Sequence, residues 1–413
     1  MLFEEIIRQK DKIRFHTPGH SRPNENLLSC DVTELSYSDN LLSPNGEIAK
    51  LEKILASAYS AEAAFLSTQG ATLNIFMAVY AVKDDGDILV IGNAHRSVYN
   101  ALRLFKSPAF HADNLNFDDI PESVKSVVLT SPDYFGRTVD LEKIYPVLKE
   151  KGITLIVDSA HGAHFAFSSK LPVSASEHSD LAILSMHKTL PVITGGSVLT
   201  CKKKYADKCL YARSLLHTTS PNYMTMCSIE QCVFDFAKNG ENYYSEIKNA
   251  VENFRENLKN PFLCEDNGDF SRLVVSSPYD GEEVSKALFD RGFVAETSVG
   301  NKVIFIVTKY NFMHLSLLCR CISELPPMKI YREENFPFPR HDKPVKLNFD
   351  GEWILVPLDK AIGRKFCGEA GLYPPGSPLL WTGDTVTKEI ARYFMNFPER
   401  SFGLENGYAR VLK

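Results

Sequence analysis

The strongest constraint on this chain is the alternation of strand-like and helix-like segments over residues 47–200. Short apolar runs such as "AAFLST", "DILVIG" and "ITLIVDSA" are separated by stretches with helical spacing, such as "GEIAKLEKILASAYS" and "DLEKIYPVLKEKG". Strands that alternate with helices of about 10 to 15 residues are typical of βαβ units with right-handed crossovers. The sequence therefore predicts an α/β fold in which helices cover both faces of a mostly parallel central sheet.

The pattern changes after residue 204. A long helical region beginning at Tyr223 is followed by shorter segments such as "SRLVVSS" and "KVIFIVT", which predict a smaller α+β domain at the C-terminal end. The start, "MLFEEIIRQKDKIRF", predicts a short amphipathic helix. It does not resemble a signal peptide, because it lacks the long uncharged core of one. The domain boundaries that we predict are 1–46 for an N-terminal segment, 47–259 for the large domain and 260–413 for the small domain.

Composition excludes several classes of partner. Hydrophobic residues make up 44% and charged residues 23% of the 413 residues, as in an ordinary globular protein. The formal net charge of −5 and the lack of a basic stripe argue against nucleic acid. No apolar run approaches the roughly 20 residues needed to cross a bilayer. The nine cysteines form no CxxC pair, which argues against disulfides and zinc. We expect a cytoplasmic protein without nucleic-acid or membrane partners.

One lysine stands at an unusual place in the pattern. In "LSMHKTLPVITGG", Lys188 comes directly after His187, where the apolar run Leu181–Leu184 has just ended. Parallel sheets bind ligands just beyond the carboxyl ends of their strands. Burial there lowers the pKa of an amine and leaves it nucleophilic toward a carbonyl group. The ordinary alternative is a paired or surface lysine, and the residues alone leave both interpretations open.

Polar residues also follow two other strand-like runs. Asp158 in "LIVDSAHGAH" is either a helix cap or a carboxylate for the pyridinium nitrogen of a cofactor. His95 in "GNAHRSVYNAL" can stack on a flat ring or can be a structural histidine. The three-residue spacing of His161 and His164 fits a metal pair on one helical turn, but no third ligand is placed, so we expect no metal.

A glycine turn adds a possible anion site. "STQGATLN" joins a strand to a helix through Gly70, and free N–H groups at a helix start, with the Ser67 and Thr72 hydroxyls nearby, can bind a phosphate. The chain order is then phosphate corner, stacking histidine, strand-end aspartate and strand-end lysine. This order is typical of a pyridoxal-phosphate enzyme of the aspartate-aminotransferase fold.

Several longer motifs carry a resemblance to a known family. They are "RFHTPGH", "DVTEL", "AHRSVYNAL", "VVLTSPDYFGRTVDLEKI", "IVDSAHGAHFAF", "SMHKTLP", "TTSPNYMTMCSIE" and "AIGRKFCGEAGLYPPGSPLL". With these motifs the chain resembles the Orn/Lys/Arg decarboxylases, which depend on pyridoxal phosphate (PLP). The resemblance is detailed from Phe15 to about Tyr223, with a second match at Ala361–Leu380.

The resemblance implies a role for each matching residue. Lys188 is the Schiff-base lysine, Asp158 the pyridinium partner and His95 the stacking residue, with His161 beside the ring. Ser220 approaches the cofactor phosphate from a second subunit, so we expect a homodimer with shared active sites. The remaining phosphate contacts are Gly70, Ala71, Thr72, Ser185 and His187.

The implied reaction is α-decarboxylation of lysine, ornithine or arginine to an amine of the polyamine pathway and CO₂. Lys188 or His187 would return a proton to Cα, and Glu369 or Asp384 would hold the distal cation of the amino acid. Other PLP reactions at Cα, such as elimination, aldol cleavage or transamination, remain open, as does an inactive regulatory homologue.

The sequence also departs from the family pattern. It begins almost at "HTPGH", so we expect a short form without the N-terminal wing domain of larger members. Ser159 stands where an acidic residue is usual, and Asp384 stands where a glutamate is usual. These differences bear on substrate identity more than on cofactor chemistry.

Overall fold

The computed structural model describes residues 13–15, 34, 38–332, 338–347, 352–373, 376 and 378–413. Within these residues the largest sheet has eight strands in the order β14-β4-β3-β5-β6-β7-β8-β2. Its strands are β2 (Ala63–Ser67), β3 (Asp87–Ile91), β4 (Ala109–Ala112), β5 (Val124–Thr130), β6 (Thr154–Asp158), β7 (Leu181–Leu184), β8 (Ser197–Cys201) and β14 (Val345–Leu347).

The middle of this sheet is parallel. Strands β4, β3, β5, β6 and β7 pair in parallel, whereas β8 is antiparallel to both β7 and β2, and β14 is antiparallel to β4. The prediction of a mostly parallel α/β sheet is therefore confirmed.

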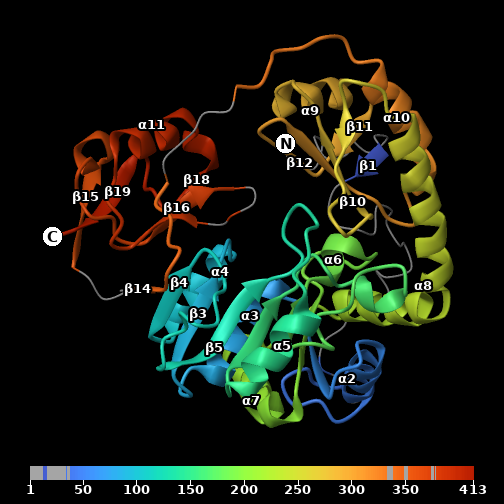
Figure 1. Ribbon diagram of the computed structural model, residues 1–413. Helices are drawn as coiled ribbons and strands as arrows, with labels where there is room; N and C mark the ends of the chain where they lie inside the picture. Colours follow the sequence, from blue (N-terminus) through green and yellow to red (C-terminus); the bar gives the residue numbers. More distant parts are fainter. Residues whose placement is uncertain are drawn as a thin grey trace.

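Helices cover both faces of the sheet (Figure 1). On β3, Ile88 and Val90 pack into one apolar cluster with helices α3, α4 and α7, while Leu89 packs into another with α5. Successive side chains of a strand point to opposite faces, so a strand buried on both sides has an almost continuous apolar run. The helices are α3 (Gly70–Val82), α4 (Arg96–Leu104), α5 (Leu141–Glu150) and α7 (Ala206–Leu216).

A helix of 35 residues, α8 (Tyr223–Asn257), leads from the large sheet to a second sheet. Asn222 caps its start by accepting a hydrogen bond from the Thr225 N–H at 3.0 Å. The second sheet has the order β12-β13-β10-β9 and is covered by α9 (Gly281–Asp290) and α10 (Leu315–Ser323). Its strands are β9 (Leu263–Cys264), β10 (Arg272–Ser276), β12 (Thr297–Val299) and β13 (Lys302–Ile306).

The N-terminal prediction is partly wrong. Residues 13–15 form strand β1 (Ile13–Phe15), which pairs in parallel with β11 (Phe293–Ala295). The ring of Phe15 is fully buried and lies 6.1 Å from Phe293 and 5.9 Å from Phe305. Burial of this ring against the small domain outweighs the helical spacing. The rest of the predicted helix, residues 1–12, lies outside the described residues.

The C-terminal strands and α11 (Lys388–Asn396) form a separate group beside β3, β4 and α4 (Figure 1). This group has its own apolar cluster, and strand β14 ties it to the large sheet by pairing with β4. The domain boundaries remain predictions. The strands are β15 (Trp353–Pro357), β16 (Glu369–Leu372), β17 (Pro378–Trp381), β18 (Ser401–Phe402) and β19 (Tyr408–Leu412).

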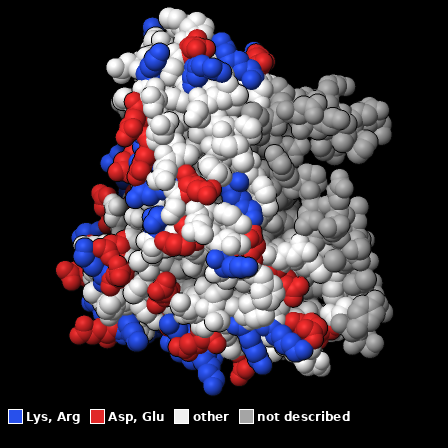
Figure 2. Space-filling model, turned by 90° about the vertical axis from the view of Figure 1, so that its right-hand side faces the viewer, with Lys and Arg blue, Asp and Glu red and all other residues white. Residues whose placement is uncertain are grey.

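The surface carries charges of both signs. On the side of the molecule that includes α8, acidic and basic side chains of the described residues are interspersed (Figure 2), and these residues form no broad basic area of the kind that nucleic acids bind. None of the helices in the described part of the chain is long and apolar enough to cross a membrane.

A buried ion pair connects helices α2 and α7 with strand β2 of the large sheet. Arg213 of α7 is fully buried and donates to Glu52 of α2 (Glu47–Ala58) and, at 3.4 Å, to the Leu66 carbonyl of β2. Glu52 also accepts from the Leu66 N–H at 3.1 Å. A buried guanidinium that loses its carboxylate keeps the full cost of its desolvation.

We predict that Glu52→Gln lowers the free energy of unfolding by about 3–5 kcal/mol, because Arg213 remains buried without a compensating charge. The control is Glu47→Gln, which breaks the pair with Lys50 in which both side chains are more than 60% exposed. Such a pair contributes at most about 1 kcal/mol. Urea unfolding followed by far-UV circular dichroism measures both variants. Equal losses in the two would contradict the role assigned to the buried pair.

Candidate active site

The carboxyl ends of three neighbouring strands bring the site together. Asp158 is the last residue of β6 and lies opposite Thr130 of β5 and Ile183 of β7. One turn of helix, α6 (Met186–Thr189), follows β7 and carries Lys188. The strand ends thus place the aspartate and the lysine at the same edge of the sheet, as the sequence predicted for a parallel fold.

Lys188 ends a chain of three hydrogen-bonded side chains. Its Nζ lies 3.1 Å from Nε2 of His161, and Nδ1 of the same ring lies 2.7 Å from an Nη of Arg272, the first residue of β10. A guanidinium can only donate, so Nδ1 of His161 accepts and carries no proton. The single ring proton is then on Nε2 and is donated to Lys188, which can accept it only as a free amine.

Electrostatics at the site favour the same state. Burial lowers the pKa of Lys188, and the Arg272 charge lowers it further, while Asp158 and Glu296 raise it. The pKa of His161 lies well below its usual value because of burial and the nearby Lys188 and Arg272 charges. The hydrogen bonds indicate a neutral imidazole beside a free amine, and the effects of burial and of Arg272 act in the same direction.

Asp158 is deeply buried at the base of the site. Its Oδ1 accepts from the Ala160 N–H at 3.1 Å. Burial raises the pKa of this carboxyl group, and the Lys188 charge opposes that effect. A buried carboxylate is costly without a cation, so Asp158 is suited to pair with a pyridinium nitrogen.

His95 caps helix α4 through its side chain. Its Nδ1 accepts from the Ser97 N–H at 3.3 Å and lies 2.7 Å from the Ser97 Oγ. Burial, with smaller contributions from the Lys188 and Arg96 charges, lowers the pKa of His95 to about 4. The ring is therefore neutral at pH 7, and a neutral ring can stack on a cationic heterocycle without charge repulsion.

The predicted anion corner lies beside α6. Gly70 opens α3 with a φ of 77°, a conformation that favours glycine, and its N–H donates to the Gly195 carbonyl at 2.8 Å. The Gly195 N–H donates to Nδ1 of His187 at 3.3 Å, and the Ser185 Oγ lies 3.4 Å from the same atom. This turn connects the start of α3, with Ala71 and Thr72, to the helix of Lys188.

The segment with Ser220 lies next to the same corner. Its backbone is anchored by the Thr218 N–H, which donates to the Gln69 side chain at 3.0 Å, and by the Asn222 N–H, which donates to Thr68 at 3.3 Å. Ser220 is exposed, with its Oγ 3.2 Å from the Thr218 hydroxyl. Its contact with a cofactor of a second subunit remains a prediction.

The two histidines of the metal alternative have different partners. Nε2 of His164 lies 3.3 Å from Asp269 and 2.9 Å from the Ser271 hydroxyl, whereas His161 faces Lys188 and Arg272. No group of three or more potential metal ligands occurs in the described part of the chain.

Sequence reasoning missed three residues of the site. Arg272 is buried, and its Nη1 has no hydrogen-bond partner among the described residues. Tyr134 follows β5 and packs its ring edge-on against His161 at 5.2 Å, and its hydroxyl donates to Glu296 at 3.0 Å. The only signal for Arg272 in the sequence is a charge at the start of the apolar run "RLVV".

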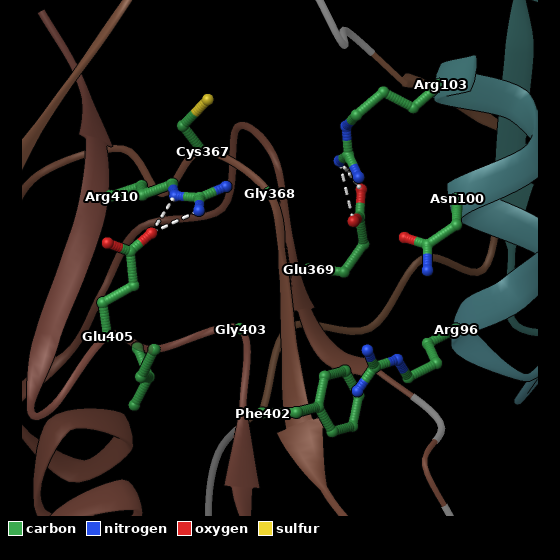
Figure 3. Close-up of a pocket in the computed structure, with 11 residues that line it drawn as sticks. Arg96, Asn100, Arg103, Cys367, Gly368, Glu369, Phe402, Gly403, Glu405 and Arg410 are labelled. Atoms are coloured by element: carbon green, nitrogen blue, oxygen red, sulfur yellow. Dashed lines mark hydrogen bonds and ion pairs between the residues drawn. The ribbon is translucent and has the colours of Figure 1, made fainter. Parts of the chain in front are cut away.

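The two carboxylates predicted to bind substrate have other contacts. Both oxygens of Glu369 lie 2.7 Å from Arg103, in a cavity of about 260 Å³ between α4 and the C-terminal strands (Figure 3). Asp384 accepts from the Trp381 N–H at 2.8 Å and lies 3.2 Å from His341. Their role as substrate contacts remains a prediction.

These residues fit PLP. Lys188 is a free amine, Asp158 is a buried carboxylate that gains from a cationic partner, and His95 is a neutral ring at a strand end. Helix α3 supplies N–H groups for a phosphate next to α6. The fold and the site together define a PLP-dependent enzyme of the aspartate-aminotransferase fold.

Comparisons with known proteins show to which family of PLP-dependent enzymes the protein belongs. The family model for the Orn/Lys/Arg decarboxylase major domain matches residues 7–116 and 111–289. The chain therefore belongs to the Orn/Lys/Arg decarboxylase family and is a PLP-dependent amino acid decarboxylase. The resemblance seen in the motifs is confirmed.

Individual relatives are similar to this protein over almost its whole length. The uncharacterized protein YaaO of Bacillus subtilis is 26% identical, with 94% of this chain and 92% of the relative covered. The arginine decarboxylase of Halalkalibacterium halodurans is 24% identical, with 95% and 92% covered. The structure of lysine decarboxylase A from Pseudomonas aeruginosa shares the fold, with a TM-score of 0.75, 16% identity, and 94% and 75% covered.

The charges around Lys188 predict opposite pH shifts in two variants. Arg272 lowers the pKa of Lys188, so Arg272→Gln should raise it, whereas Asp158 raises this pKa, so Asp158→Asn should lower it. Only the free amine reacts with an aldehyde. The pH at which cofactor-stripped enzyme binds PLP at half its maximal rate should therefore move up in Arg272→Gln and down in Asp158→Asn.

The rate is followed by the visible absorbance of the bound cofactor over a range of pH. Arg291→Gln is the control, since this arginine is exposed at the end of α9. A shift of both test variants in the same direction would rule out this electrostatic account.

Proposed function

We propose that the enzyme removes the α-carboxyl group of a basic amino acid, namely lysine, ornithine or arginine. The observation that carries the proposal is the amine of Lys188, which His161 connects to the buried Arg272, whose Nη1 has no hydrogen-bond partner among the described residues. A cation at this place suits an amino acid carboxylate, because buried donors without a partner are rare unless they serve a ligand. Relatives named as arginine and lysine decarboxylases support a basic substrate.

Each residue then has a defined task. Bound PLP supplies an aldehyde for amines and an electron-poor ring that draws electrons from Cα. Lys188 provides the amine that holds the cofactor and yields its place to the substrate amine. Asp158 keeps the proton on the ring nitrogen, and Arg272 orients the α-carboxylate. Lys188 or His187 returns a proton to Cα.

We predict that Lys188→Ala loses both CO₂ release, by at least about 1,000-fold, and the visible absorbance of the bound cofactor, because no other amine takes its place. Lys149→Ala, which removes an exposed lysine of α5, should change neither. CO₂ release from a panel of amino acids, with products analysed by mass spectrometry, tests the reaction itself. Products of elimination, aldol cleavage or transamination, without CO₂, would overturn the proposal.

The proposal also includes a homodimer in which Ser220 reaches the cofactor phosphate of the partner. If PLP binds the associated state preferentially, it stabilises the dimer. We predict that sedimentation at decreasing protein concentration shows dissociation that added PLP suppresses, and that Ser220→Ala weakens PLP binding by about 3- to 10-fold. The exposed Ser123, just before β5, provides the control variant Ser123→Ala. Full activity of a monomer at the lowest concentration would exclude shared sites.

A further inference from the structure

We propose that Glu296 binds the distal cationic group of the substrate. The inference rests on the proposed function and adds to it the residue that selects basic over neutral amino acids. Glu296 lies between β11 and β12 in the small domain, whereas Asp158 ends β6 of the large sheet and Lys188 lies in α6, which follows β7.

A short series of contacts connects Glu296 to the reacting amine. Its Oε1 accepts from the Tyr134 hydroxyl at 3.0 Å. The Tyr134 ring contacts the His161 ring at 5.2 Å between centroids, and His161 lies 3.1 Å from Lys188. The carboxylate is therefore two side chains away from the amine that the substrate replaces. A basic amino acid carries its second charge at the end of a flexible chain of three or four carbons and can span such a separation.

Two carboxylates act on Lys188, and they differ in accessibility. Although burial lowers the pKa of Lys188, the charges of Asp158 and Glu296 both raise it. Asp158 is almost fully buried at the base of the site, where it is suited to pair with the ring nitrogen of the cofactor. Glu296 is only half-buried. A carboxylate can accept several hydrogen bonds at once, so the Tyr134 contact does not prevent a second one.

Tyr134 lies between two opposite charges of the small domain. Its hydroxyl donates to Glu296, and the Arg272 guanidinium lies 6.0 Å from the centre of its ring. Burial, and then the Glu296 charge, raise the pKa of Tyr134, so the hydroxyl keeps its proton and remains a donor. An amino acid with its carboxylate toward Arg272 and its distal cation toward Glu296 is oriented by both charges.

The two carboxylates that the sequence suggested for the distal cation have partners in the structure. Glu369 is held by Arg103 through both of its oxygens, as the dashed lines of Figure 3 show, and Asp384 lies 3.2 Å from His341. A substrate cation would have to compete with these groups.

The test compares a basic amino acid with its neutral isostere, such as arginine with citrulline or lysine with 2-aminohexanoic acid. In Glu296→Gln, kcat/KM for the basic substrate should fall by about 10- to 100-fold, mainly through KM, while the value for the neutral isostere stays the same or rises. Glu296→Asp, which keeps the charge, should retain part of the preference. Calorimetry on the holoenzyme should show the same loss for a diamine and none for a monoamine of equal length.

Glu283→Gln, an exposed carboxylate of α9 in the same domain, is the matched control. A purely structural role of Glu296 would lower activity toward both isosteres equally, and this result would overturn the inference. Loss of the preference in Glu369→Gln but not in Glu296→Gln would also overturn it. If the wild-type enzyme released CO₂ from no basic amino acid, the proposed function itself would fail, so the two failures are distinguishable.

Discussion

The site depends on the fact that a guanidinium can only donate hydrogen bonds. Because Arg272 lies 2.7 Å from Nδ1 of His161, the imidazole has one available arrangement of its proton, and that arrangement requires Lys188 to be a free amine. The charge of Arg272 acts in the same direction by lowering the pKa of the lysine. Geometry and electrostatics therefore prepare the nucleophile before any ligand arrives, and the aspartate at the end of β6 limits how far the pKa falls.

Sequence reasoning recovered the parts of the molecule that are encoded locally. Strands buried on both faces have apolar runs, so β3, β5, β6 and β7 were predictable, together with Asp158 and Lys188 at their ends. Strands β4 and β8 were missed because they contain buried polar residues that have specific partners. In β4, His111 lies 3.1 Å from the Tyr99 hydroxyl, and in β8, Thr200 lies 2.8 Å from Ser176. No periodic pattern marks such residues.

The remaining site residues depend on tertiary packing. Arg272 begins a strand of another sheet, and its place beside His161 follows from how the small domain packs on α8 and the large domain. The C-terminal group contributes as well, since the Arg96 N–H, one residue after His95, donates to the Gly376 carbonyl at 3.2 Å. Three parts of the chain that are far apart in sequence therefore meet at one cofactor site. Residues from only one part, the parallel sheet, carry a sequence signal strong enough to be recognised.

The pairing of β1 with β11 has a consequence for synthesis of the protein. Phe293, the partner of Ile13, is synthesised about 280 residues after it. At about 5–20 residues per second, the first strand waits for tens of seconds with its Phe15 ring unburied. Contacts of such long range also slow folding because a large loop must close first. The nascent chain therefore exposes the Phe15 ring until the small domain emerges, and a chaperone that covers short segments with exposed aromatic side chains would increase the yield of folded enzyme.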